Sequence, residues 1–211
     1  MGNINYDYTS LFIEDLINDT DFVAIRKYAM ENNVPIMNSQ TKELIISILK
    51  ILKPKKILEI GTAIGYSALC FEKYTGAEIT TIELDENTAT IARRNFEKYN
   101  VNVNLINGDA MKALRNLNQG FDFVFIDANK SRYLDYFKMT SKLINKDGII
   151  IADNVLFRGE VCNDEIMEKR KNTLVKRLRN FLAYITDLED FTSSVIPIGD
   201  GLTLSVRRDN D

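Results

Sequence analysis

The sequence predicts a single α/β domain with a mostly parallel β-sheet, helices on both faces of that sheet and a C-terminal antiparallel hairpin. Two observations predict this fold class. Short runs of β-branched and aromatic residues alternate with amphipathic stretches, which is the order expected of a parallel sheet with helical crossovers. In addition, residues 123–126 and 149–151 are apolar without alternation, as central parallel strands buried on both faces are.

Five strands are predicted ahead of the hairpin, and four amphipathic helices are predicted between or after them. In each helical stretch the apolar residues recur at spacings of three and four, which places them on one helix face. The predicted strands are 56–60, 78–83, 103–106, 121–127 and 148–153, and the predicted helices are 65–73, 86–99, 111–117 and 132–143.

The two ends of the chain complete this arrangement. Residues 9–31 and 40–52 predict two or three helices before the sheet. Near the other end, residues 191–196 and 202–206 flank the segment PIGDG, whose Pro and Gly favour a tight turn between antiparallel strands. Because there is no internal repeat or linker, we expect one domain, with N-terminal helices in 1–52 and the α/β core in 53–211.

The composition excludes several classes of function. The chain has 211 residues, a formal net charge of −3 and no histidine, which excludes Ser-His triads, His-ligated zinc and imidazole bases. Its two cysteines, Cys70 and Cys162, form no CxxC pair, which fits a reducing compartment. No stretch has the pattern of a secretion signal or a membrane span. We therefore expect a cytoplasmic protein without a membrane partner, in which Lys, Tyr, Cys or a carboxylate moves protons.

A glycine-containing loop follows the first predicted strand in the segment ILEIGTAIGYS. Gly61 and Gly65 are spaced as neither GxGxxG nor a Walker A loop, and the acid Glu59 would repel a pyrophosphate but suits a cationic ligand. Glu83 ends the next strand, where a carboxylate can accept both ribose hydroxyls, and Asp109 follows the third. The three acids favour adenosine with a positively charged tail. The alternative is that such acids cap helices, and it applies most readily to Asp109.

Polar side chains also end the fourth and fifth predicted strands. Asp127 ends one strand, and Asp153 and Asn154 end the other, so a parallel sheet brings all three to one edge. Oxygen ligands without sulfur or nitrogen favour a hard cation, in particular Mg²⁺. Lys130 lies on the same turn, and beside a cation and an apolar wall it can act as a general base. The alternatives are that the acids cap a helix and a turn, and that Lys130 is a solvated lysine.

Taken together, these segments resemble the catechol-type, Mg-dependent S-adenosylmethionine O-methyltransferases. The resemblance covers nearly the whole chain and rests on several motifs that occur in the order of the family. These motifs are ILEIGTAIGYSAL, TTIELD, NGDA, FDFVFIDANKSRYLDYF, GIIIADNVLFRG and PIGDGL. It implies a Rossmann-like methyltransferase fold with a seven-stranded sheet, and S-adenosylmethionine and Mg²⁺ as cofactors.

The resemblance also implies a role for each matching residue. In S-adenosylmethionine binding, Glu59 would contact the amino group, Ser67 the carboxylate and Glu83 the ribose. Asp127 would serve the cofactor, the metal and catalysis, with Lys130 as the catalytic base. The remaining expected cofactor residues are Met37, Gly61, Thr62, Asp109 and Ala110, and the expected metal ligands are Asp127, Asp153 and Asn154.

The acceptor of the methyl group is predicted less directly. The animal catechol enzymes have an additional acidic residue where this chain has Ser194, which weakens a catechol assignment. Residues 158–182 hold seven Lys or Arg against four Asp or Glu, and a helix predicted over 164–185 has an apolar stripe and a basic face. The basic face suits a phosphate backbone, although it can also be an ordinary solvated face. The stripe is Ile166, Leu174, Leu178, Phe181 and Ile185; the basic residues are Lys169, Lys176 and Arg179, with Arg170 and Arg177 at its flanks.

One bacterial branch of the family has a similar length and the same GTAIGYSA and PIGDGL segments, and it methylates 5-hydroxyuridine at the wobble position of tRNA. The 5-hydroxyl and O4 of that base are vicinal oxygens, and a base in an anticodon loop can be splayed into a pocket. The resemblance therefore favours the tRNA anticodon loop as partner. The second candidate is a small vicinal diphenol or caffeoyl-type phenol, for which the basic helix would be incidental.

Two other function classes and one assembly remain open at this stage. A nicotinamide-dependent dehydrogenase is disfavoured by the missing GxGxxG loop, and a non-catalytic adenosine- or RNA-binding module is disfavoured by the complete set of acids and Lys130. A homodimer is expected from the resemblance. The N-terminal helices carry more apolar residues than one short face needs: Phe12, Ile13, Leu16, Ile17 and Phe22.

Overall fold

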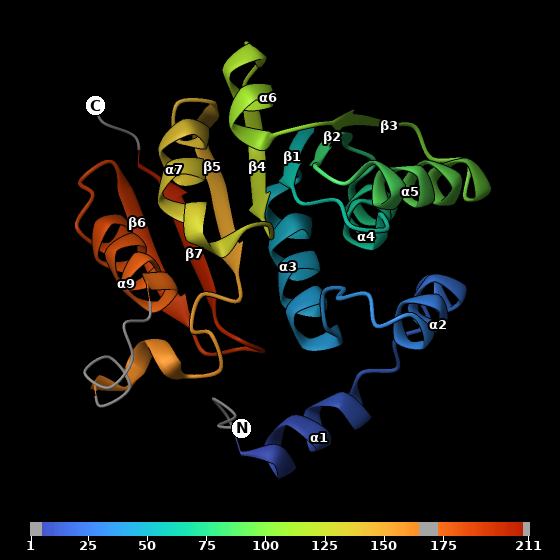
Figure 1. The fold of residues 1–211 in the computed structure, drawn as a ribbon, viewed down its shortest axis with the longest axis horizontal. Coiled ribbons are helices and arrows are strands. Elements are labelled where there is room, and N and C mark those ends of the chain that lie inside the picture. The colour runs from blue at the N-terminus through green and yellow to red at the C-terminus, as the bar shows by residue number, and fades with distance from the viewer. Residues whose placement is uncertain (1–5, 165–172, 209–211) are drawn as a thin grey trace.

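The structure, a computed structural model, describes residues 6–164 and 173–208. Its centre is a seven-stranded sheet in the order β3-β2-β1-β4-β5-β7-β6 (Figure 1). The first five strands are parallel, and β7 lies antiparallel between β5 and β6. The strands are β1 (Lys56–Ile60), β2 (Glu78–Glu83), β3 (Val103–Asn107), β4 (Phe121–Ile126), β5 (Ile144–Asp153), β6 (Phe191–Ile196) and β7 (Leu202–Arg207).

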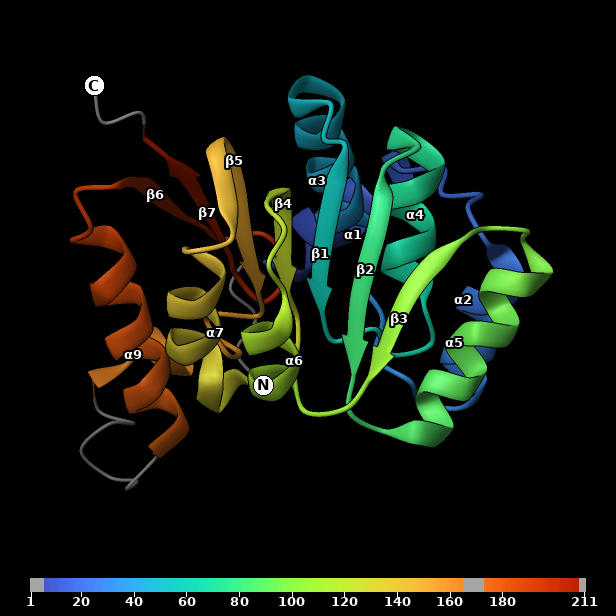
Figure 2. The same ribbon diagram turned by 90° about the horizontal axis from the view of Figure 1, so that it is seen from above.

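Helices cover both faces of this sheet. Figure 2 shows α6, α7 and α9 on one side, whereas α3, α4 and α5 lie on the other, and each group packs on its own apolar cluster. Because β1 and β4 are buried almost throughout, their side chains contribute to both clusters. The helices are α1 (Asp7–Leu16), α2 (Val23–Glu31), α3 (Ser39–Leu52), α4 (Tyr66–Thr75), α5 (Glu86–Lys98), α6 (Ala110–Asn116), α7 (Tyr133–Thr140) and α9 (Thr173–Thr186).

The position of the candidate site follows from the strand order. The chain runs outward from β1 to β3 and then returns to place β4 on the other side of β1. Ligands in open α/β sheets bind outside the carboxyl ends of the strands at such a switch point. The loops after β1, β4 and β5 therefore determine what this protein can bind.

The predicted fold class is confirmed, and most boundaries agree within two residues. The exceptions are α7, which ends at Thr140 rather than at residue 143, and β5, which begins at Ile144 rather than at residue 148. Residues 145–147 are polar and resemble a turn, but Ile144 pairs with Phe121 and the register shifts before Phe123. A β-bulge thus absorbs the polar residues without ending the strand.

The predicted basic helix is described only in part. Within α9, Leu178, Phe181 and Ile185 are buried against the sheet, as the apolar stripe predicts. Ile166, Lys169 and Arg170 lie outside the described residues. Arg179 does not belong to a free basic face, because its guanidinium donates to the carbonyl of Val161 (2.7 Å) and to Asp164 (2.8 Å).

Large apolar side chains are exposed mainly on the N-terminal helices. On α1, Phe12 and Leu16 are more than 60% exposed, whereas Phe22 is half-buried against Tyr66 and Tyr99. The homodimer stays a prediction, with this surface as its expected interface. Among the described helices, none combines the length and the apolar character that crossing a bilayer requires.

Candidate functional site

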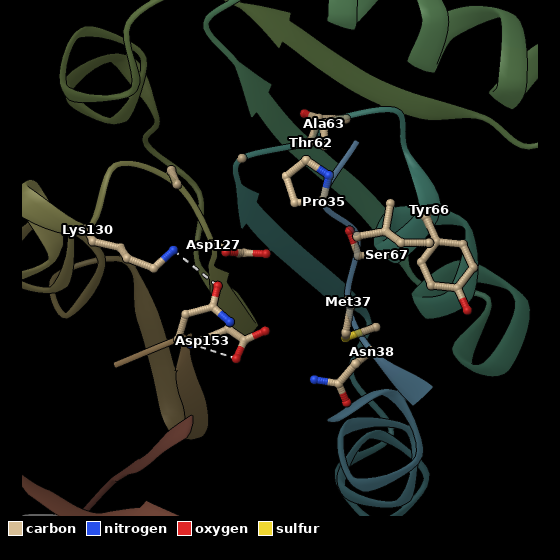
Figure 3. A pocket seen from close by; sticks show the side chains of 14 residues that line it. Pro35, Met37, Asn38, Thr62, Ala63, Tyr66, Ser67, Asp127, Lys130 and Asp153 are labelled. Atoms are coloured by element: carbon tan, nitrogen blue, oxygen red, sulfur yellow. Dashed lines mark hydrogen bonds between the residues drawn. The ribbon is translucent and has the colours of Figure 1, made fainter. Parts of the chain in front are cut away.

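A cavity of about 350 Å³ opens at the carboxyl ends of β1, β4 and β5 (Figure 3). Its volume lies within the range of about 300 to 1,000 Å³ that is usual for cofactor and ligand sites. One wall comes from the segment between α2 and α3, and the opposite wall comes from the loops after β4 and β5. The lining residues are 35–38, 61–63, 66–67, 127–128, 130 and 153–154.

The loop after β1 forms one side of this cavity with backbone close to the ligand space. Gly61 has a φ of +100°, and a Cβ built on it would lie 2.1 Å from the carbonyl oxygen of Asp127. Only glycine fits there, so the loops after β1 and β4 touch through their main chains. Ala63 is left-handed with a φ of +45°, and its N–H donates to Glu83 Oε2 at 2.9 Å. Glu83 thus anchors the loop from the end of β2.

Glu59 lies beneath this loop and is fully buried. Its carboxylate accepts hydrogen bonds from the hydroxyls of Ser67 and Thr81. Burial raises the pKa of Glu59 to about 7, and the charges of Asp127 and Glu83 act in the same direction. The site therefore contains a buried acid that a nearby cation would ionise.

Two further acids and an amide meet at the ends of β4 and β5, as the sequence predicts. Lys130 Nζ donates to Asn154 Oδ1 at 3.1 Å, and Figure 3 shows Lys130, Asp127 and Asp153 around one corner of the cavity. Asn154 has a φ of +57°, a conformation that Asn tolerates better than most residues. The hydroxyl of Tyr133 donates to the main-chain oxygen of Asp153 at 2.8 Å and fixes the end of β5.

The two aspartates fit a divalent cation. Burial raises the pKa of both carboxyls, and the charge of Asp127 contributes to raising that of Asp153 to about 7. The half-buried carboxylate of Asp127, the buried carboxylate of Asp153 and an amide oxygen form a hard donor set whose like charges a divalent ion would offset. No group of three or more His, Cys, Asp or Glu in metal-binding arrangement occurs in the described parts of the chain, so the set depends on Asn154 as its third donor.

Four predicted cofactor residues do not line the cavity. Glu83 anchors the loop through Ala63, and Glu59 lies beneath the loop with Ser67 and Thr81 as its partners. Asp109 caps α6, where it accepts from the backbone N–H of Lys112 at 3.0 Å, and its carboxylate lies 3.9 Å from Arg132. These contacts agree with the helix-cap alternative. Ala110 is the first residue of α6.

Several lining residues were not predicted from the sequence. Pro35, Ile36 and Asn38 flank the predicted Met37, and Ala128 follows Asp127. Tyr66 lies directly before the predicted Ser67, and its hydroxyl points away from the cavity and donates to Asp19 at 3.2 Å (Figure 3). In the sequence, the one signal that could have identified these residues is their position next to predicted site residues. By contrast, Ser194 lies exposed on β6 and not among the lining residues.

Comparison with known proteins identifies the family of this chain. A family model described as O-methyltransferase matches residues 9–208. The chain belongs to the O-methyltransferase family. Among relatives of this methyltransferase, a caffeoyl-CoA O-methyltransferase of Stellaria longipes is 31% identical over 78% of this chain and 73% of the relative.

Solved structures agree with this assignment. A crystal structure from Staphylococcus aureus has 31% identity and a TM-score of 0.88, covering 95% of this chain and 100% of that one. The O-methyltransferase from Bacillus cereus in complex with SAH, the demethylated form of the cofactor, has 27% identity and a TM-score of 0.84, covering 95% and 97%. The present methyltransferase is therefore an S-adenosylmethionine-dependent enzyme, and the dehydrogenase and the non-catalytic binding module are excluded.

Proposed function

We propose that this O-methyltransferase transfers the methyl group of S-adenosylmethionine to a hydroxyl that has a vicinal oxygen, with Mg²⁺ held by Asp127, Asp153 and Asn154. The observation that carries the proposal is the corner at the ends of β4 and β5. There Lys130 Nζ lies 3.1 Å from Asn154 Oδ1, beside the carboxylates of Asp127 and Asp153, on the wall of the cavity that Gly61 and Thr62 also line. The proposal is supported because a lysine, three oxygen-bearing side chains and a cavity meet at one edge of the sheet.

The proposed chemistry needs a deprotonated acceptor held in line with the sulfonium methyl group. When bound, Mg²⁺ would favour the ionised form of a hydroxyl that ligates it. Lys130 accepts the hydroxyl proton, and the acceptor oxygen forms a bond to the methyl carbon while the carbon–sulfur bond breaks. Because charge is neutralised in this step, alignment and the exclusion of water carry much of the acceleration. Pro35, Met37 and Tyr66 supply apolar wall for that purpose.

In the proposed cofactor site, Glu59 receives the amino group of S-adenosylmethionine. Its folded-state pKa of about 7 implies that at acidic pH the carboxyl is protonated and the attraction to the ammonium is lost. We therefore expect affinity for S-adenosylmethionine to fall as the pH is lowered through about 7, and binding at pH about 6 to release a proton.

This expectation is checked by calorimetry of cofactor binding in two buffers with different ionisation enthalpies. Glu59→Gln should weaken binding about tenfold or more at pH 8 and remove both the pH dependence and the proton release. Proton release that persists in Glu59→Gln would assign the titration to another group.

For the acceptor, we propose 5-hydroxyuridine in the anticodon loop of tRNA, which would become 5-methoxyuridine. The proposal is supported by cationic side chains beside the corner that holds Lys130. Arg177 is exposed and donates to the carbonyl of Ser131 at 3.3 Å. Lys176, which precedes Arg177, and Arg132, which follows Ser131, are exposed as well. Such groups can bind the phosphates that flank a splayed base.

The second candidate acceptor is a small catechol or a caffeoyl-type phenol. It is favoured by the relative from Stellaria longipes, which is named for caffeoyl-CoA. The vicinal hydroxyls of a caffeoyl group would meet the same donor set. Arg132, Lys176 and Arg177 would then have no direct part in binding a small diphenol.

Methyl transfer from labelled S-adenosylmethionine separates these acceptors. The protein is incubated with Mg²⁺ and either tRNA that lacks wobble methylation or a panel of catechols and caffeoyl thioesters. We expect label in tRNA, and we expect the double variant Arg132→Ala, Arg177→Ala to lower kcat/KM for tRNA about tenfold, with a weaker salt dependence. Label in the phenols alone would establish the second candidate.

A further inference from the structure

A chain of hydroxyl groups reaches the carboxylate oxygen of Glu59 that Ser67 does not contact. In the parallel pairing of β1 with β2, Glu59 stands beside Thr81, so both side chains point to the same face of the sheet. Thr81 Oγ1 donates to Glu59 Oε2 at 2.5 Å, and Thr62 Oγ1 lies 2.6 Å from Thr81 Oγ1. Glu59 and Thr81 are 0% exposed and Thr62 is 1% exposed, so water does not compete for these contacts.

Proton counting fixes the direction of this chain when Glu59 is ionised. A threonine hydroxyl has one proton to donate. Since Thr81 gives its proton to Glu59, the contact of 2.6 Å requires Thr62 to donate to Thr81. The order is therefore Thr62 to Thr81 to Glu59. Because the oxygen of Thr81 accepts from Thr62, the O–H group of Thr81 becomes a stronger donor to Glu59, as in other buried hydrogen-bond networks.

Ser67 cannot serve as a constant donor to the same carboxylate. Its single proton points to Glu59 in this structure, and the proposed cofactor site uses Ser67 to bind the carboxylate of S-adenosylmethionine. If Ser67 turns to the cofactor, Thr81 is the one hydroxyl in the described residues that still donates to Glu59. The amino group of the cofactor then takes the place of Ser67.

We propose that Thr81, supported by Thr62, is a positioning residue that holds the Glu59 carboxylate ionised and oriented toward the amino group of S-adenosylmethionine. The inference rests on the proposed cofactor role of Glu59. The other charged groups that act on Glu59, Asp127 at the end of β4 and Glu83 at the end of β2, both disfavour its ionised form. On the β4 side its register partner is the apolar Phe125. Donation from Thr81 therefore opposes burial and two like charges.

The test measures binding of S-adenosylmethionine by calorimetry between pH about 5.5 and 9. Thr81→Val keeps the shape of the side chain and removes the donor. A hydrogen bond to a buried charge is worth roughly tenfold or more in affinity, so we expect binding to weaken about tenfold at pH 8. We also expect the midpoint of the pH dependence to rise by about one unit. Thr81→Ser should restore both values, and kcat at saturating cofactor should change little.

Thr80→Val is the matched control. Thr80 is also buried in β2, but it is the neighbouring residue and therefore points to the opposite face, where Asn104 contacts it at 3.4 Å. The control should leave affinity and midpoint unchanged. If Thr81→Val does not fold, Thr62→Val provides the second test, with a smaller shift of the pH midpoint in the same direction expected.

The outcomes separate the inference from the function on which it rests. Weaker binding and a raised midpoint in Thr81→Val, with rescue by Thr81→Ser, support the role of Thr81. Unchanged binding in Thr81→Val, while Glu59→Gln weakens binding, overturns this inference alone. Unchanged binding in Glu59→Gln overturns the cofactor role of Glu59 and the inference with it.

Discussion

Replacing Lys130 with alanine is expected to lower kcat about 10³-fold, while affinity for S-adenosylmethionine stays within about twofold. Lys130 is the candidate base at the corner, and its Nζ lies 3.1 Å from Asn154 Oδ1, one of the proposed metal ligands. General-base catalysis contributes about 10² to 10⁴ in rate, so removal of the amine should act on the chemical step. Single-turnover methyl transfer and cofactor calorimetry measure the two quantities separately.

Lys142→Ala is the matched control for this prediction. Lys142 is an exposed lysine in the turn after α7 and does not line the cavity. Its replacement should leave kcat and cofactor affinity unchanged. A Lys130→Ala variant with normal single-turnover rates would remove Lys130 from the mechanism, and the acceptor would then have to ionise without help from a protein base.

Replacing Asp153 with asparagine is expected to have opposite effects on turnover and on metal-free stability. Turnover should fall at least about 100-fold, because a carboxylate of the proposed Mg²⁺ site is lost. In the metal-free protein, however, the same change should be stabilising at pH 8. Burial and the charge of Asp127 raise the pKa of Asp153 from the ordinary 3.8 to about 7.

The sign of the stability effect follows from proton linkage. An unfolded chain loses the Asp153 proton near pH 3.8 and the folded chain loses it only near pH 7. Between these values the folded state binds more protons, so stability falls as the pH rises and stays low above pH 7. Because asparagine does not ionise, the stability of Asp153→Asn does not fall in this way. It should gain about 2 kcal/mol or more over the metal-free parent at pH 8, and no such difference should remain at pH about 4.

Thermal unfolding with and without Mg²⁺ at the two pH values measures these effects. Mg²⁺ should raise the Tm of the parent protein at pH 8 and leave that of Asp153→Asn unchanged. Asp187→Asn, at an exposed position after α9, should follow the parent in every condition. A parent protein whose Tm does not respond to Mg²⁺, Mn²⁺ or Ca²⁺ would contradict the proposed metal site.

Most of the sheet could be predicted from the sequence because the residue type changes where a strand ends. In β1 and β2, apolar runs end at acids or glycines, and both strands match their predicted residues. The start of β5 could not be predicted in the same way. Its polar residues 145–147 are accommodated only because Ile144 pairs with Phe121 on the neighbouring strand, and such a pairing is a tertiary contact.

Site residues could be predicted from the sequence where the side chain is charged and stands at the end of a strand. Residues whose role depends on a tertiary contact could not be predicted. The acids and Lys130 are recognisable from their charge and their place at strand ends. Thr81 appears in the sequence as an ordinary strand threonine, and only the register with β1 places it against Glu59. Tyr66 lines the cavity with its ring while its hydroxyl binds Asp19, a contact across 47 residues of sequence. Neither role can be inferred from one strand or helix alone.

The contact of Gly61 with the carbonyl of Asp127 joins two parts of the enzyme that could otherwise change independently. A methyl group at Gly61 would overlap the main chain of Asp127 at 2.1 Å, so a substitution of Gly61 would displace the acid at the end of β4. Engineers who wish to alter the methyl donor would have to redesign both loops together.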